Sequence, residues 1–217
     1  MRITPSCLHK AFIRTACFLM LSVPAAADQG QQLYSTCAAC HGGQGQGNPA
    51  LQAPALAGLD SDYIQRQLEL FQAGSRGSKP GDTAGAQMRA AAGVLTSADQ
   101  IAAVSDFISE LSPTTADVTV EGNIRNGTNH YQATCGTCHG SQGQGNKALK
   151  APALAGQDGE YLRRQYLNFR KGLRGYDAND RPGRQMAMMA NGLNDEQLND
   201  VIAFIGQLQP TTEPVEH

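Results

Sequence analysis

Tryptophan is absent from this sequence, and only 6% of its 217 residues are aromatic. Charged residues are also scarce, at 17%, and they are nearly balanced, with 17 Lys and Arg against 19 Asp and Glu. Proteins that bind nucleic acid carry a strongly basic face, so this balance argues against that class. No apolar run approaches the roughly 20 residues that a membrane-spanning helix needs. A small domain with so few large apolar side chains buries little core of its own.

The first 27 residues have the pattern of a secretory signal peptide. Arg2, Lys10 and Arg14 precede an apolar stretch of about a dozen residues that ends at Ala27, and the segment contains no acidic residue. We expect cleavage after Ala27 and export of the remaining chain to the periplasm. Retention of the segment as an uncleaved anchor is the alternative.

Four cysteines remain after such a cleavage, and they form two identical motifs. "CAACH" begins at Cys37 and "CGTCH" begins at Cys135, so each pair of cysteines is followed at once by a histidine. The surrounding sequence is duplicated as well, with an offset of 97 or 98 residues. The matched segments are Gly30–Tyr34 with Gly127–Tyr131, Pro54–Gly58 with Pro152–Gly156, Gln87-Met88 with Gln185-Met186, and Leu111–Thr115 with Leu208–Thr212.

This duplication predicts two domains, at residues 28–116 and 117–217, joined by a Pro/Thr stretch near residues 113–119. Residues 28–116 contain four basic and eight acidic residues, whereas residues 117–217 contain ten basic and eleven acidic residues. Seven of those ten basic residues lie between Arg163 and Arg184. They indicate either a solvated helix face or a docking patch for a partner, and the sequence leaves both interpretations open.

Each copy is predicted to be mostly helical, so the fold class is all-α. Apolar residues recur at spacings of three and four in the last helix of each copy, at Ile101, Val104, Ile108 and Leu111 and at Leu198, Val201, Ile205 and Leu208. Ser97 with Gln100, and Asn194 with Gln197, predict capped N-termini for these helices. A middle helix is expected over residues 62–71 and 160–170, and a first helix leads into each Cys motif. No segment alternates with period two.

Cys-x-x-Cys-His is typical of covalent haem attachment. Two thiols on successive turns at the end of a helix can add to two vinyl groups of a porphyrin, and the next residue then lies under the iron. This predicts one haem on Cys37 and Cys40 with His41 as iron ligand, and a second on Cys135 and Cys138 with His139 as ligand. The porphyrin would supply the missing apolar core. Zinc would need two Cys pairs close in sequence, and a thioredoxin-like pair would need a βαβ context; neither is present.

Methionines occupy equivalent positions downstream of the two motifs. Met88 follows His41 by 47 residues, and Met186 follows His139 by the same distance. Methionine sulfur opposite the histidine closes the iron coordination and raises its potential, so we expect Met88 and Met186 to be the sixth ligands. Met188 is the alternative ligand for the second haem. It has no methionine counterpart in the first copy.

These motifs together resemble class I cytochrome c, and two such modules after a signal peptide resemble the cytochrome c4 family of two-haem periplasmic electron carriers. The resemblance implies that Gly30 and Tyr34, and Gly127 and Tyr131, pack against the last helices near Phe107 and Phe204. It implies that the carbonyls of Pro54 and Pro152 accept hydrogen bonds from the two histidines. It also implies two lobes facing each other about a pseudo-twofold axis, with haem propionates near their interface.

Saturated haems leave no site for a substrate, so the predicted function is single-electron transfer in a respiratory chain and not catalysis. The resemblance implies a donor such as a quinol-oxidising membrane cytochrome complex and an acceptor such as a terminal oxidase or reductase. We expect a monomer, with peripheral membrane association left open. The alternatives are a small haem enzyme (a peroxidase or an oxidase of sulfur compounds) and a haem subunit of a larger dehydrogenase or oxidase.

Overall fold

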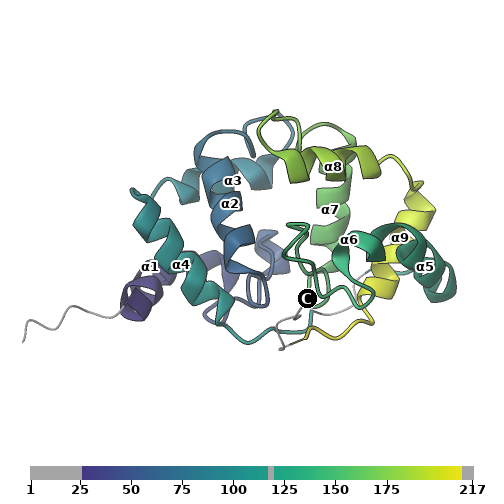
Figure 1. Ribbon diagram of the computed structural model, residues 1–217, viewed down its shortest axis with the longest axis horizontal. Coiled ribbons are helices and arrows are strands. Elements are labelled where there is room, and N and C mark those ends of the chain that lie inside the picture. Colours follow the sequence, from purple (N-terminus) through teal and green to yellow (C-terminus); the bar gives the residue numbers. More distant parts are fainter. Residues whose placement is uncertain (1–25, 117–119, 212–217) are drawn as a thin grey trace, which may run out of the picture.

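The computed structural model describes residues 26–116 and 120–211, and it contains two helical lobes that lie side by side (Figure 1). Most of the predicted signal peptide, residues 1–25, and part of the linker, residues 117–119, lie outside the described residues. The first lobe contains α1 (Ala26–His41), a 3₁₀ turn η1 (Pro49–Leu51), α2 (Ser61–Gln72), α3 (Thr83–Ala92) and α4 (Ala98–Ser109).

The second lobe repeats this order with one interruption. It contains α5 (Ile124–His130), η2 (Tyr131–Cys135), α6 (Gly136–His139), α7 (Gly159–Arg170), α8 (Arg181–Met189) and α9 (Asp195–Ile205). The only β-structure in the described ranges is two isolated bridges, Asn48–Ala53 and Asn146–Ala151. The all-α prediction is therefore confirmed. None of these helices is long and apolar enough to cross a membrane.

A single inserted residue explains why the first helix of lobe 2 is broken. Three positions separate Tyr34 from Cys37, but four separate Tyr131 from Cys135. The segment Tyr131–Cys135 is π-helical, and a π turn takes up an extra residue inside a helix. The aromatic residue and the first cysteine therefore keep the relative orientation that they have in lobe 1.

The capped last helices form as predicted. The Ser97 hydroxyl accepts a hydrogen bond from the backbone N–H of Gln100 at 3.2 Å, and Asn194 and Gln197 form a reciprocal capping box. Such caps satisfy N–H groups that have no partner within the helix. The apolar stripe of α4 is buried at Ile101, Val104 and Ile108, where it forms the core of lobe 1 with residues of α2.

Glycines allow the first and last helices of each lobe to cross closely. A Cβ at Gly30 would lie 2.7 Å from the Cβ of Phe107, and one at Gly127 would lie 2.6 Å from the carbonyl carbon of Asp200. The neighbouring tyrosines pack as expected, because the Tyr34 and Phe107 ring centroids are 5.4 Å apart. The equivalent pair in lobe 2, Tyr131 with Phe204, is 5.3 Å apart.

Helices α3 and α8 are not identified by the sequence periodicity. Each begins at a buried aspartate: Asp82 accepts a hydrogen bond from the N–H of Gly85, and Asp180 accepts one from the N–H of Gly183, both at 3.0 Å. Ala92 is the one residue of α3 that is buried, and Gly183 is the one in α8. These helices therefore lack the apolar stripe that marks a helix packed on a protein core.

The lobes face each other through α2 and α7, which stand on either side of the centre of Figure 1. Arg66 donates to the Lys150 carbonyl at 2.9 Å, and Arg164 donates to the Gln52 carbonyl at 2.8 Å. Arg164 is the equivalent of Arg66 in the second copy, and Lys150 is the equivalent of Gln52. The reciprocal contacts agree with the pseudo-twofold arrangement that the resemblance implies.

Buried arginines occupy the middle of this interface. Arg76 donates to Gln165 at 3.0 Å, while Arg174 donates to Gln67 at 2.9 Å. Each guanidinium also lies over a phenylalanine of its own lobe, with centroid distances of 4.4 Å for Phe71 and 4.5 Å for Phe169. Hydrogen bonds between polar side chains therefore join the centre of the two lobes, while a cation–π contact holds each guanidinium within its own lobe.

Candidate haem sites

Each Cys-x-x-Cys-His motif lies at the C-terminal end of a helix. His41 is the last residue of α1, and His139 is the last residue of α6. The following residues, Gly42 and Gly140, each have φ near +81°, a left-handed conformation that glycine adopts without strain. The hydroxyl of Tyr34 donates to the Gly42 carbonyl at 2.6 Å, which ties the end of the motif back to the helix. The Tyr131 hydroxyl donates to the Gly140 carbonyl at 2.7 Å in the same way.

The four cysteines of the described residues form no disulfide with one another. Cys37 and Cys135 are half-buried, while Cys40 and Cys138 are exposed. Burial raises the pKa of Cys37, and it raises the pKa of Cys135 to about 11. A thiol–disulfide exchange pair instead lowers the pKa of its attacking thiol, so the thioredoxin-like alternative is not supported.

The histidines are held as neutral imidazoles. The Nδ1–H of His41 donates to the Pro54 carbonyl, and that of His139 donates to the Pro152 carbonyl, both at 2.9 Å. These bonds confirm the expectation and leave Nε2 as the free nitrogen. Burial lowers the pKa of both imidazoles although the carbonyl opposes this effect. A neutral ring with one nitrogen fixed by a hydrogen bond is the form that binds a metal ion.

A largely apolar cavity of about 440 Å³ lies beside the motif in lobe 2. Cys135, Cys138 and His139 line it, and so does Met186 of α8. Its walls also include Leu154, Leu162, Tyr166, Phe169, Val201 and Ile205. In lobe 1, Cys37 and Met88 both pack against the same apolar cluster. The cavity of lobe 2 therefore brings both predicted thiols together with Met186, and in lobe 1 Cys37 and Met88 share one apolar cluster.

Helix geometry separates the two methionines that compete for the second site. Met186 and Met188 are two residues apart in α8, which places them about 200° apart around the helix axis. The side chain of Met186 is half-buried, whereas Met188 is 70% exposed. Met186 is therefore the better placed of the two to meet an iron between α8 and His139.

The residues around the cavity fit a haem. Its porphyrin is apolar, as the walls are, and it carries two carboxylates that need cationic partners. The Nε atoms of Arg66 and Arg164 are buried without a hydrogen-bond partner among the described residues. Arg66 and Arg174 also line the cavity where it reaches the lobe interface. Guanidinium groups pair strongly with carboxylates, so these arginines could hold the propionates.

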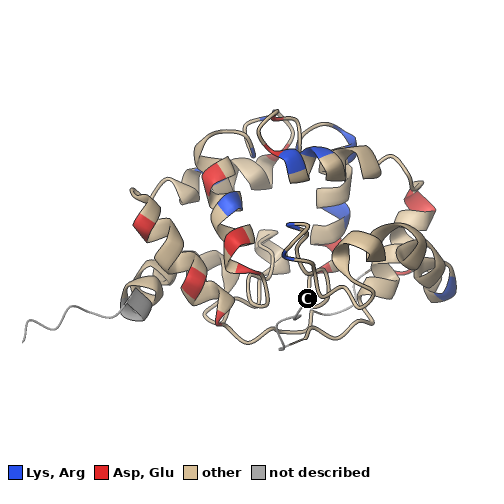
Figure 2. Ribbon diagram, viewed as in Figure 1, with Lys and Arg blue, Asp and Glu red and all other residues tan. Residues whose placement is uncertain are grey.

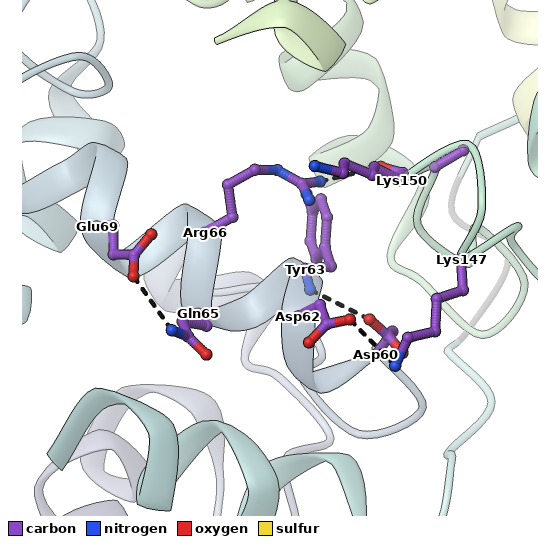
Figure 3. A pocket seen from close by; sticks show the side chains of 9 residues that line it. Asp60, Asp62, Tyr63, Gln65, Arg66, Glu69, Lys147 and Lys150 are labelled. Carbon is purple, nitrogen blue, oxygen red and sulfur yellow. Dashed lines mark hydrogen bonds and ion pairs between the residues drawn. The ribbon is translucent and has the colours of Figure 1, made fainter. Parts of the chain in front are cut away.

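A second hollow, of about 330 Å³, lies between α2 and the loop before α7 (Figure 3). Lys147 of lobe 2 forms ion pairs there with Asp60 at 3.3 Å and Asp62 at 3.1 Å of lobe 1. The hydrogen bond to Asp62, and then that to Asp60, raise the pKa of Lys147. No Cys, His or Met lines this hollow. Among the described residues, no group of three or more His, Cys, Asp or Glu is arranged to hold a metal ion.

Comparisons with known proteins agree with this geometry. The cytochrome c family model matches residues 27–112 and again residues 124–209. A thiosulfate dehydrogenase electron acceptor of Stutzerimonas stutzeri is 30% identical over 208 residues, covering 88% of this chain and 91% of that protein. Cytochrome c4 of Azotobacter vinelandii is 28% identical over 191 residues, covering 83% and 87% of the two chains. The crystal structure of reduced cytochrome c4 from Pseudomonas stutzeri has a TM-score of 0.67 at 28% identity, covering 84% of this chain and 98% of that one.

The chain belongs to the cytochrome c family. Its two matched domains and its similarity to cytochrome c4 place it among the two-haem class I cytochromes of the c4 type. Two covalently bound c-type haems follow from the two domains and their paired cysteine motifs. The protein is thus a dihaem electron carrier similar to cytochrome c4.

Proposed function

We propose that Cys37 and Cys40 carry one haem with His41 and Met88 as iron ligands, and that Cys135 and Cys138 carry the other with His139 and Met186. The two haem-binding units would span residues 28–116 and 117–217. The observation that best supports this assignment is the histidine-to-proline hydrogen bond, which recurs at 2.9 Å in both lobes. The equal spacing of 47 residues from each histidine to its methionine agrees with it.

Each residue of this set has a defined task. The bound haem supplies an iron that gains or loses one electron. Nε2 of each histidine would bind that iron, while the proline carbonyl on Nδ1–H fixes the ring orientation and makes the imidazole a stronger ligand. The methionine sulfur would be a further ligand and would favour the reduced state. Arg66, Arg164 and Arg174 at the lobe interface would balance the haem carboxylates.

With a histidine and a methionine as ligands, neither iron would have an open coordination position for a small molecule. We therefore propose that the protein is an electron carrier and not an enzyme. Peroxide provides the test. The ferric protein should keep a far-red methionine-to-iron absorption band from both haems after peroxide is added. A high-spin fraction that reacts with peroxide would favour the alternative, a small haem peroxidase.

We further propose that the carrier works in the periplasm as a monomer. It would accept electrons from a quinol-oxidising membrane complex and deliver them to a terminal oxidase or reductase. The predicted signal peptide supports export, and the low aromatic content suits the small, brief interfaces of redox partners. Sedimentation of the purified holoprotein should give one polypeptide per particle. A stable complex with a dehydrogenase or oxidase would instead favour the subunit alternative.

A second electron donor is favoured by the comparison with the thiosulfate dehydrogenase electron acceptor. The oxidised protein, mixed with a thiosulfate dehydrogenase, should be reduced only when thiosulfate is added. A single-haem cytochrome c serves as the control acceptor. If the control is reduced equally fast, the transfer is non-specific and this donor assignment fails.

A further inference from the structure

The outer face of α8 carries two exposed arginines and one exposed methionine. Arg181, Arg184 and Met188 follow one another at spacings of three and four, so they lie on one side of the helix. Gly183 and Ala190 occupy the opposite, buried side. Both arginines are exposed, and Met188 is 70% exposed and lies at the rim of the haem cavity. Figure 2 shows basic residues on α8 and acidic residues on α2 and α4 of the other lobe.

Lobe 1 provides an internal comparison for this face. The equivalents of Arg181, Arg184 and Met188, at an offset of 98, are Thr83, Ala86 and Ala90 of α3. Met189 is also exposed, and its equivalent is Ala91. Both helices cover the same position in their lobes, and α3 has no methionine besides Met88 and a single arginine, Arg89, whose equivalent in α8 is Ala187. The fold and the haem site therefore do not require these side chains on α8.

The structure also shows which of the seven basic residues between Arg163 and Arg184 are engaged within the protein and which are exposed. Four of its members are engaged within the protein: Arg163 with Asn199, Arg164 with Gln52, Arg170 with Asp195, and Arg174 with Gln67. Lys171, Arg181 and Arg184 remain exposed, and none of the three forms an ion pair with another described residue. The charge available to a partner is therefore concentrated at α8 and the adjacent end of α7.

We propose that the α8 face, defined by Arg181, Arg184 and Met188, docks a redox protein with an acidic surface around its electron-exchange site. The proposal rests on the proposed carrier function. Positive charge beside the haem cavity attracts such a partner from a distance of about one Debye length, and it orients the encounter. The flexible methionine adapts to different apolar surfaces. Small interfaces of this kind suit rapid binding and release.

The electron balance is simple. With the partner bound at α8, one electron would pass between its redox centre and the iron that His139 and Met186 would hold. That iron would change between ferrous and ferric, and the partner would change by one electron in the opposite sense. No atom or proton is transferred. Lobe 2, and not lobe 1, is the exchange point for this partner.

A strongly acidic flavodoxin serves as the probe. Its affinity for the haem-loaded protein is measured by surface plasmon resonance, and its rate of electron donation by stopped-flow absorbance, both at low and high salt. Arg181→Glu/Arg184→Glu should weaken binding and slow the second-order rate by about tenfold or more at low salt. Arg89→Glu/Arg125→Glu makes the same change in net charge at exposed positions outside the α8 face and should alter either value by less than about threefold. Met188→Ala should raise the dissociation rate.

Equal losses in the two charge-reversal variants would mean general attraction to an acidic protein and would overturn the proposal. Unchanged binding and rate in Arg181→Glu/Arg184→Glu would overturn it too. The haem absorption spectra and reduction by dithionite report the carrier itself. Their loss in the unmodified protein would count against the proposed function, whereas the flavodoxin results concern only the docking face.

Discussion

At the scale of residues, the assignment depends on which sulfur faces each iron. The sequence identifies both cysteine pairs, both histidines and the methionines at equivalent spacing. It could not separate Met186 from Met188, because spacing along the chain does not show the direction of a side chain. That direction became available only when both residues were found in one helix, on nearly opposite sides.

Replacement of Met88 by alanine should affect one haem only. Loss of the sulfur ligand should lower the potential of the lobe 1 haem by a substantial fraction of the roughly 0.8 V range that axial ligands span. The lobe 2 haem should remain nearly unchanged. Optical redox titration of the variant checks this, and equal shifts in both haems would show that the lobes are not independent units.

Met188 provides the matched control for the second site. Met186→Ala should abolish the far-red band of the lobe 2 haem, whereas Met188→Ala should leave it intact. If Met188→Ala removes the band and Met186→Ala does not, the ligand assignment is reversed.

At the scale of elements, the apolar periodicity predicted the helices that pack on protein and missed α3 and α8, which cover the proposed haem sites. The stripe of α4 is visible because Ile101, Val104 and Ile108 face a protein core. In α3 and α8 the inward side chains are glycine, alanine and the methionine at the haem site. These helices would pack against a haem and not against other side chains. Their inward faces therefore need few large apolar residues and leave little apolar pattern in the sequence.

Because α1 and α4 cross closely at Gly30, a methyl group added there should lower the stability of the fold. Gly30→Ala would force its Cβ into Phe107, and such overpacking costs about 1–3 kcal/mol. The melting temperature of the holoprotein should fall by roughly 2–12 °C. Gly43→Ala is the control, because a Cβ at Gly43 meets no atom within 4 Å. Similar losses in both variants would contradict the crossing as the cause.

The π-helical segment in lobe 2 predicts that one residue can be removed there. Deletion of Ala133 should restore the spacing of lobe 1, so both haems should still attach. Deletion of Ser35 in lobe 1, where the helix is regular, should rotate Gly30 and Tyr34 by about 100° away from α4 and reduce haem attachment. The haem-to-protein ratio measures both outcomes. Loss of haem in the Ala133 deletion alone would contradict this account of the insertion.

At the scale of the whole molecule, the lobe interface could not be derived from the sequence. It is built from arginine, glutamine and tyrosine side chains that lie far apart in the chain. Sequence patterns report mainly apolar burial, and the centre of this interface is polar. The duplication did predict that two similar lobes exist, and the resemblance to cytochrome c4 supplied their arrangement.

The buried arginines should contribute more to holding the lobes together than the exposed ion pairs do. Arg76→Gln/Arg174→Gln would remove the charged donors to Gln67 and Gln165, and each unsatisfied buried partner costs about 1–3 kcal/mol. The radius of gyration from X-ray scattering should increase, and thermal unfolding should separate into two steps. Lys147→Ala removes only the exposed pairs with Asp60 and Asp62 and should change neither measurement, since such pairs contribute about 0–1 kcal/mol. An unchanged radius in the double arginine variant would show that other contacts hold the interface.

The central claim is that each lobe holds a covalent haem whose iron is bound by histidine and methionine. A spectroscopic redox titration of the purified holoprotein, followed in the far-red band, tests it directly. The account predicts two one-electron steps per polypeptide, with a methionine-to-iron band of two-haem amplitude in the ferric form. A single step per polypeptide, or a ferric form without that band, would contradict it.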